Sequence, residues 1–405
     1  MKVAIIGGGA SGLIASIIAK RQGFDVVIIE KQDRIGKKIL ATGNGRCNMT
    51  NLKLLADNFH TSYKGNHFLP IEIINLEKTL EFFKDLGIIP YVENNKVFPL
   101  SKQASSVLDV LMLEINRLNI DTLLNSKVIN LIKKGQHFEI DLVKEDKKEK
   151  LIIDKVIVAS GGQAGVHSDL TIYNMLKDLG HEVLPINPSL VQIISSSNYC
   201  KTIKGIRVDC EVSIYRNNVC EKKEFGEVLF TEDGLSGPAI FQISRVASIC
   251  KKNDESCYVK LDLHPEFNKE QLIQIIYERI DKNPTNSLEQ LFIGWINKKI
   301  ATVIIKNSNV GNINRLCNEL EYEEIERLVN SIKSLRFDIV GTRGFKFAQT
   351  TIGGISLDDV NLETMESKVL KGLYITGEIL DVDGDCGGYN LQWAWSTGYI
   401  AGKIR

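Results

Sequence analysis

Three glycines near the start of the chain have the spacing that dinucleotide binding requires. Gly7, Gly9 and Gly12 form the pattern glycine-x-glycine-x-x-glycine, and Glu30 follows at the end of an apolar run. The first glycine permits a tight turn, the second lets the backbone approach a pyrophosphate, and the third lets a helix pack closely on a strand. A carboxylate at Glu30 can accept hydrogen bonds from ribose hydroxyls. The pattern predicts a dinucleotide site, and the carboxylate disfavours a 2′-phosphate and therefore NADP at this position.

The elements that must position these residues are visible in the same segment. Residues 3–6 are a continuous apolar run typical of a buried parallel strand, residues 11–22 predict a helix, and residues 26–29 predict a second buried strand. A glycine-rich turn that arises by chance is not expected to lie between a buried strand and a helix. Strand, turn, helix and strand in this order therefore favour nucleotide binding.

A first arm after Glu30 bears on the choice between FAD and NAD. Residues 36–48 are rich in glycine and basic side chains. Such a segment can pass along a pyrophosphate and reach an isoalloxazine ring. Arg46 is a natural contact for a phosphate or a flavin oxygen, because a guanidinium forms charge-assisted hydrogen bonds.

A second arm lies near the C-terminus. Residues 374–378 predict a strand that ends at Gly377 and Glu378, where a carboxylate can bind ribitol, and residues 387–390 begin a helix. The amides at the start of this helix would face the pyrimidine edge of the flavin and stabilise the negative charge of its reduced form. The two arms favour FAD over NAD.

Several motifs, spread in order along the chain, carry a family resemblance. The chain resembles the bacterial NAD(P)/FAD-dependent oxidoreductases of the aminoacetone-oxidase-like and bile-acid-inducible-reductase-like type. The matching stretches are TGNGRCNMTN at 42–51, FPLS at 98–101, LFTEDGLSGPA at 229–239, TMESK at 364–368 and the run 377–402. The chain departs from the family at residues 163–169, where the family has a turn rich in Ser, Pro, Thr and Gly.

The resemblance implies an α/β fold with a FAD-binding Rossmann-type domain like that of glutathione reductase and with inserted β-barrel-like and helical domains. The FAD-binding domain is expected at 1–188 and 350–405. A strand-like alternation of apolar and polar residues places the β-rich insertion at 189–265 and 335–349, and helical spacing places the second insertion at 266–334.

Motifs and resemblance together predict a set of cofactor contacts spread over both ends of the chain. The expected residues are Gly7, Gly9, Ala10, Ser11, Gly12, Glu30, Lys31, Lys38, Gly43, Arg46, Cys47, Asn48, Val128, Gly161, Gly377, Glu378, Gly388, Asn390 and Leu391. No catalytic residue can be assigned from the sequence.

The cysteines and histidines do not indicate a second kind of site. No two of the eight cysteines form a Cys-x-x-Cys pair, so no metal site is expected. A disulfide reductase needs two cysteines beside the flavin, typically with four residues between them. The partner of Cys47 would then be residue 52, which is Leu52. Packing is the favoured interpretation for Cys47 and Cys386. His167 and His181 are interpreted as structural.

Charge and hydropathy limit the possible partners. The 50 basic and 50 acidic residues cancel, so no nucleic acid is expected as a partner. No stretch approaches the roughly 18 apolar residues of a membrane span, and we expect a cytoplasmic protein without a membrane partner. The sequence does not predict the oligomeric state.

The expected function is that of a FAD-dependent oxidoreductase acting on a small organic substrate. Two reactions remain open: reduction of an acceptor at the expense of NADH or NADPH as a transient electron donor, and oxidation of an amine with oxygen as acceptor. The alternative from another class is a non-catalytic redox sensor or an RNA-associated flavoprotein.

Overall fold

The computed structural model describes residues 1–165 and 169–404, and the chain divides into two compact units. Met1–Asn187 with Thr350–Arg405 make up the first unit, and Pro188–Gln349 make up the second. The boundaries of the first unit lie within one residue of those expected for the FAD-binding domain. The further division of the insertion at 265/266 and 334/335 stays a prediction, because both parts fall within the second unit.

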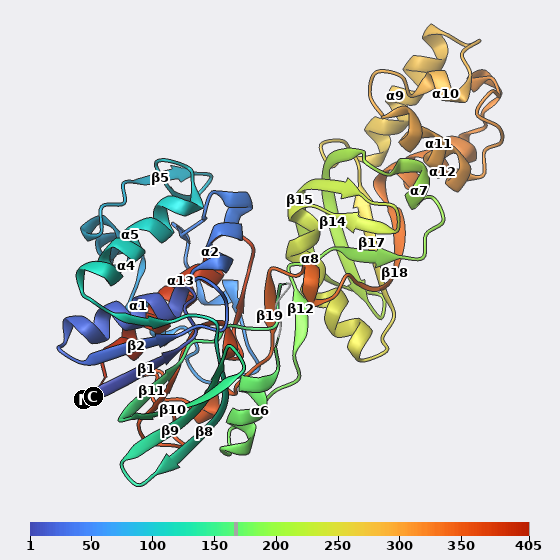
Figure 1. Ribbon diagram of the computed structural model, residues 1–405. Coiled ribbons are helices and arrows are strands. Elements are labelled where there is room, and N and C mark those ends of the chain that lie inside the picture. The colour runs from blue at the N-terminus through green and yellow to red at the C-terminus, as the bar shows by residue number, and fades with distance from the viewer. Residues whose placement is uncertain (166–168, 405) are drawn as a thin grey trace. The chain divides into compact units, whose positions relative to one another are not determined.

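A five-stranded parallel sheet forms the centre of the first unit, with the strand order β20-β11-β1-β2-β7 (Figure 1). Its strands are β1 (Lys2–Ile6), β2 (Asp25–Ile29), β7 (Asp121–Leu123), β11 (Lys155–Val158) and β20 (Leu373–Ile375). The apolar run of β1 is buried from its second residue onwards, as a strand covered on both faces must be.

Two helices from opposite ends of the chain pack against each other in the first unit. These are α1 (Ala10–Arg21) and α13 (Tyr389–Gly402). A Cβ atom on Gly398 would lie 2.4 Å from the carbonyl oxygen of Ser11, so only glycine permits this approach. Gly398 therefore permits the close packing of α13 against α1.

Shorter elements complete the first unit. The antiparallel sheets consist of β8 (Ser126–Lys134), β9 (His137–Lys144) and β10 (Lys147–Ile153); of β3 (Thr50–Asn51), β6 (Lys96–Pro99) and β5 (Pro90–Glu93); and of β4 (Phe59–His60) with β21 (Asp383–Gly384). The remaining helices are α2 (Lys37–Ala41), α3 (Leu69–Ile73), α4 (Leu76–Asp85), α5 (Ala104–Arg117) and α6 (Thr171–Asp178). Strands β12 (Asn187–Ser189) and β19 (Thr350–Ile352) form a two-stranded sheet.

The second unit contains a closed barrel with the strand order β13-β16-β15-β14-β17-β18, which confirms the β-barrel-like insertion (Figure 1). The strands are β13 (Ile193–Ser195), β14 (Arg207–Arg216), β15 (Val219–Phe230), β16 (Gly234–Ser236), β17 (Cys257–Asp262) and β18 (Leu335–Thr342). The helices are α7 (Cys200–Ile203), α8 (Pro238–Lys252), α9 (Lys269–Lys282), α10 (Leu288–Leu291), α11 (Lys298–Ser308) and α12 (Tyr322–Lys333). Helix α12 buries Ile325, Leu328, Val329 and Ile332, whose three- and four-residue spacing places them on one apolar face.

Among the described residues, no helix combines the length and the apolar character needed to cross a membrane. Within 1–165 and 169–404, no group of three or more His, Cys, Asp and Glu side chains could hold a metal ion.

Candidate functional site

The glycine-rich turn joins β1 to α1 so tightly that two of its glycines admit no side chain. Gly7 has a φ of +107°, and a Cβ on it would lie 2.4 Å from the carbonyl oxygen of Ala159. A Cβ on Gly12 would lie 2.0 Å from the carbonyl oxygen of Gly7. Both glycines therefore serve the packing of strand and helix, as the sequence pattern predicts.

Gly9 differs from these two glycines, because nothing in the fold requires its lack of a side chain. Its backbone is extended, with φ −86° and ψ −166°, and a Cβ there would meet no described atom within 4 Å. The backbone is thus open to close approach from outside the chain. Helix α1 also begins without a capping side chain or an acidic residue in its first turn. Its N-terminal amides and dipole suit a phosphate, and the turn fits a dinucleotide.

Glu30 lies at the end of β2 and faces the turn. One carboxylate oxygen accepts from the amide of Gly8 at 2.8 Å, and the other accepts from the amide of Gln32 at 2.8 Å. Two backbone donors hold the carboxylate in place, and its remaining lone pairs can accept from ribose hydroxyls. Val128 lies near the same place, since the amide of Ser126 in β8 donates to the carbonyl of Glu30. Val128 is buried and adjoins an irregularity in β8.

The two expected cofactor arms meet in the structure. The Lys38 ammonium lies 2.5 Å from a carboxylate oxygen of Glu378, and the other oxygen of Glu378 accepts from the Thr351 hydroxyl at 3.1 Å. Gly377 lies directly over α1, because a Cβ on it would be 2.4 Å from the Ser11 hydroxyl. Residues more than 300 positions apart are thereby brought to the same side of the sheet.

Gly161, Lys31 and Gly43 are three further residues that the sequence predicts at the cofactor. A Cβ on Gly161, which follows β11, would meet nothing within 4 Å. Lys31 lies 3.8 Å from the carboxylate of Asp169. Gly43 and the neighbouring Asn44 both have left-handed backbones at the end of the first arm.

Arg46 is engaged by the protein itself. Its guanidinium forms two hydrogen bonds with the Glu93 carboxylate, at 3.1 and 3.0 Å, and lies 4.2 Å from the centre of the Phe98 ring. The Glu93 carboxylate raises the pKa of Arg46. The buried Nε atom has no partner in the described structure. The sequence predicts that Arg46 contacts a phosphate or a flavin oxygen. Arg46 would have to make this contact while it stays bound to Glu93.

An unpaired acceptor marks the start of α13. The side-chain oxygen of Asn48 is buried without a hydrogen-bond partner among the described residues. It would lie 2.9 Å from a Cβ on Gly388, the residue that precedes α13. An unsatisfied buried acceptor costs about 1–3 kcal/mol, so a donor from a ligand is favoured here. The ring N–H of a flavin pyrimidine is such a donor, and the site therefore fits the flavin.

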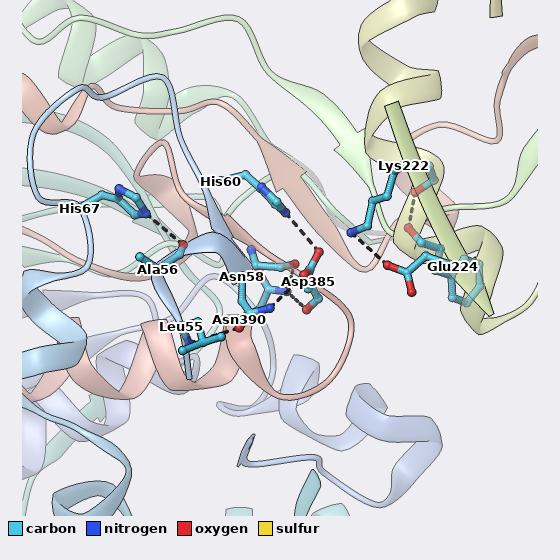
Figure 2. A network of polar contacts seen from close by, with 12 residues as sticks. Leu55, Ala56, Asn58, His60, His67, Lys222, Glu224, Asp385 and Asn390 are labelled. Carbon is cyan, nitrogen blue, oxygen red and sulfur yellow. Dashed lines mark hydrogen bonds and ion pairs between the residues drawn. The ribbon is translucent and has the colours of Figure 1, made fainter. Parts of the chain in front are cut away.

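The loop before α13 is held by a few polar side chains. Asn390 accepts from the amide of Gly384 at 2.8 Å and from the Thr350 hydroxyl at 3.2 Å, and it donates to the carbonyl of Gly384 at 2.8 Å. Its neighbour Leu391 is half-buried. Asp385 accepts from the His60 ring at 3.1 Å, as Figure 2 shows.

His60, Asn58 and Asp385 are not among the residues that the sequence predicts at the site. The acidic run that includes Asp385 stands directly before the glycines at 387 and 388, which could have drawn attention to it. Nothing in the sequence links it to residues 58–60, because β4 is only two residues long.

Cys47 and His181 both lie in buried surroundings. Cys47 is fully buried, and burial raises the pKa of its thiol to about 11, so the protonated form dominates at neutral pH. His181 bonds to the Leu176 carbonyl and the Ser367 hydroxyl, and burial lowers its pKa. His167 lies outside the described residues.

Comparison with known proteins agrees with this geometry. The family model described as HI0933-like protein Rossmann domain matches residues 1–404. The chain is 35% identical to a 3-dehydro-bile acid delta(4,6)-reductase of Clostridium scindens, over 99% of this chain and 98% of the relative. It is 27% identical to a ribosomal RNA dihydrouridine synthase of Haemophilus influenzae, over 98% of this chain and 96% of the relative.

A solved structure shows the same fold. The open conformation of a flavocytochrome c3 fumarate reductase has a TM-score of 0.51 at 14% identity, covering 100% of this chain and 77% of that one. The chain belongs to the HI0933-like family, it is a FAD-dependent oxidoreductase, and FAD is its cofactor. The expectation that no nucleic acid is a partner is not confirmed, since one relative is named for ribosomal RNA.

Proposed function

We propose that this member of the HI0933-like family reduces a carbon–carbon double bond conjugated to a carbonyl group, with NADH or NADPH as the transient electron donor. The observation that carries the proposal is the end-to-end similarity to the bile acid delta(4,6)-reductase. A 3-oxo bile acid with double bonds at positions 4 and 6 is a conjugated enone. Dihydrouridine, the product in the name of the second relative, is uridine whose ring double bond beside a carbonyl has been saturated.

The reactions named for these two relatives are the same kind of reduction, on substrates that differ in size and polarity. A double bond conjugated to a carbonyl accepts a hydride at its β carbon and a proton at its α carbon. The chemistry that bound FAD would supply is hydride transfer from its reduced form. The chain must hold the cofactor, exclude water from the reacting atoms and provide the proton.

The cofactor contacts follow from the geometry of the first unit. We assign the pyrophosphate to the turn and the start of α1, the adenosine ribose to Glu30, the adenine to the neighbourhood of Val128, and the ribitol to Glu378. The remaining residues of each group are Gly7, Gly9, Ala10, Ser11 and Gly12 for the pyrophosphate, Lys31 for the adenosine, Lys38, Gly161 and Gly377 for the ribitol, and Gly43, Arg46, Cys47, Asn48, Gly388, Asn390 and Leu391 for the ring.

Helix α13 has a chemical part in this arrangement. It runs from Tyr389 to Gly402 and begins at Gly388, beside the unpaired oxygen of Asn48. Its amides and its positive dipole end would lie at the pyrimidine edge of the ring and stabilise negative charge there. A reduced flavin bound here would carry such charge, and the start of the helix would stabilise it.

An anaerobic experiment in two stages tests the proposed function. The purified FAD protein is first mixed with NADH, NADPH or a panel of primary amines, and loss of flavin absorbance is followed. The reduced protein is then mixed with 2-cyclohexenone, 4-androstene-3,17-dione, uridine or a ribosomal RNA fragment. We expect reduction by a nicotinamide and reoxidation by at least one conjugated acceptor, with the saturated product identified by mass spectrometry.

The outcomes separate the alternatives. Reduction by an amine, with return of the colour only in oxygen, would support amine oxidation instead. Reoxidation by the RNA fragment alone would identify a nucleic acid substrate, and reoxidation by the steroid alone a small molecule. A flavin that no donor reduces would favour a redox sensor or an RNA-associated flavoprotein without turnover.

A further inference from the structure

We propose that His60, oriented by Asp385, donates the proton that completes the reduction, and this inference rests on the proposed reductase function. His60 would be a catalytic residue and Asp385 a positioning residue. A short sheet joins the segment 59–60 to the loop before α13.

Two short strands bring the pair together. In the antiparallel pair of β4 and β21, His60 lies opposite Asp383 and Phe59 lies opposite Gly384. The His60 Nε2 atom lies 3.1 Å from Oδ1 of Asp385, and the Asn58 amide donates to Oδ2 at 3.2 Å (Figure 2). The backbone amide of Asp385 also donates to the carbonyl of Asn58, at 2.9 Å. The carboxylate is thus held on both oxygens and through its backbone.

This contact determines which ring nitrogen can serve a ligand. An ionised carboxylate only accepts hydrogen bonds, so Nε2 of His60 must carry a proton to bind Asp385. The other nitrogen, Nδ1, has no partner in the described parts of the chain, and the side chain is 29% exposed. An imidazole held in this way by a carboxylate is the arrangement that catalytic histidines use to transfer protons from the opposite nitrogen.

The position of the pair ties it to the flavin edge. Asp385 precedes Gly388 by three residues, and Gly388 adjoins the unpaired oxygen of Asn48. Asn390, in the first turn of α13, donates to the carbonyl of Asp385 at 3.4 Å. The loop that begins the flavin-facing helix therefore also carries the group that orients His60.

The step balances in atoms and charge. A hydride adds to the β carbon of the conjugated acceptor, and the electron pair of the double bond moves to the α carbon and its carbonyl. The Nδ1–H bond of the His60 imidazolium breaks, and a C–H bond forms at the α carbon. The ring is left neutral with Nε2–H still bound to Asp385, and solvent returns a proton to Nδ1.

The first test separates the two half-reactions in His60→Gln. Each FAD protein is reduced anaerobically with NADPH, and in a parallel sample with stoichiometric dithionite, then mixed with 2-cyclohexenone or 4-androstene-3,17-dione. We expect reoxidation to slow by about 100-fold, a loss typical of a missing general acid, while reduction by NADPH keeps its rate. Reoxidation of His60→Gln at the wild-type rate would overturn the proposal.

His67 supplies the matched control. It lies seven residues further along, and its ring contacts the backbone carbonyl of Ala56 at 3.2 Å instead of a carboxylate (Figure 2). His67→Gln should keep both rates. An equal slowing in both variants would show a general effect of the segment and would contradict a specific role for His60.

Further measurements keep the proposal testable if His60→Gln does not fold. In the wild-type protein, reoxidation by the enone should slow as pH rises, because the proton donor is lost, and a rate independent of pH between about 5 and 9 would overturn the proposal. In Asp385→Asn, this pH profile should shift, because the amide no longer stabilises the imidazolium. His60→Ala should regain reoxidation when free imidazole is added.

Failure of the inference differs from failure of the proposed function. If no conjugated acceptor reoxidises the wild-type protein, the reductase function is wrong. If the wild-type protein is reoxidised and His60→Gln is equally fast, only the role of His60 is wrong.

Discussion

The carboxylate of Glu30 accepts a hydrogen bond from the backbone amide of Gly8 at 2.8 Å, which ties the end of β2 to the glycine-rich turn. The contact joins the acid that would bind ribose to the backbone that would bind pyrophosphate. The ribose and the pyrophosphate are covalently joined in the ligand. The hydrogen bond between Glu30 and Gly8 therefore sets the distance between the two parts of the protein that would bind them.

Replacement of Glu30 should therefore weaken cofactor binding. In Glu30→Ala the amides of Gly8 and Gln32 lose the carboxylate that accepts their hydrogen bonds. The ribose hydroxyls of the cofactor lose the same acceptor. We expect FAD affinity to fall roughly 10- to 100-fold, since a hydrogen bond to a charged group contributes about 1.5–3 kcal/mol. Titration of the apoprotein, followed by quenching of flavin fluorescence, measures the change. The exposed Glu363 provides a control in Glu363→Ala, and equal affinities in the two variants would contradict the assignment.

Gly9 and Gly12 should respond to substitution in opposite ways. Gly9→Val should leave the stability of the apoprotein unchanged and abolish FAD binding, because its side chain enters open space beside the backbone. Gly12→Ala should lower the free energy of unfolding by about 1–3 kcal/mol, because its Cβ would overlap the carbonyl oxygen of Gly7. Thermal unfolding of the apoproteins and flavin titration give both quantities. A Gly9→Val protein with stoichiometric FAD would show that the pyrophosphate lies elsewhere.

Loss of the Asn390 side chain should loosen the loop before α13. Asn390→Ala removes two hydrogen bonds to Gly384, one to Thr350 and a longer one to the carbonyl of Asp385, at a cost of about 1–2 kcal/mol in unfolding free energy. Hydrogen exchange over residues 383–390 should become faster, and reduction by NADPH slower. The substitution Asn361→Ala, in an exposed turn, is a control that should leave exchange in this loop unchanged. Unaltered exchange in Asn390→Ala would mean that the loop is held by other contacts.

The Cys47 thiol should make stability depend on alkaline pH. Its pKa is raised by burial from the ordinary value of 9.0 to about 11. Between these values the unfolded chain releases a proton that the folded protein keeps, so stability is full below pH 9 and falls as pH rises towards 11, by at most about 1.4 kcal/mol per pH unit. Denaturant unfolding of wild type and Cys47→Ala at pH 8.5 and 10.5 measures this difference. Equal losses in both proteins would contradict burial of the thiol.

Much of the first unit was predictable from its sequence, because its signals are local. The helix expected at 11–22 is observed as Ala10–Arg21, and the strands expected at 3–6 and 26–29 are observed as Lys2–Ile6 and Asp25–Ile29. Glycine spacing, apolar runs and turn residues act on neighbouring backbone, so a single segment carries the whole signal.

Partners that lie far apart in the chain were not predictable. Arg46 was expected at a phosphate or a flavin oxygen, whereas the fold pairs it with Glu93 and Phe98. A guanidinium meets whichever carboxylate the fold brings near it, and residue type alone does not say which one. The same holds for Lys38 and Glu378, which were both expected at the cofactor without any sign that they contact each other.

The sequence by itself determined the cofactor, the family and the order of the elements, because these depend on short motifs and on periodicity along the backbone. Only the tertiary structure decided that Glu30 also holds Gly8, that the Asn48 oxygen is left unpaired beside α13, and that His60 meets a carboxylate 325 residues away. Such contacts arise when separate segments pack together, and their energies come from atoms that no local pattern brings into contact.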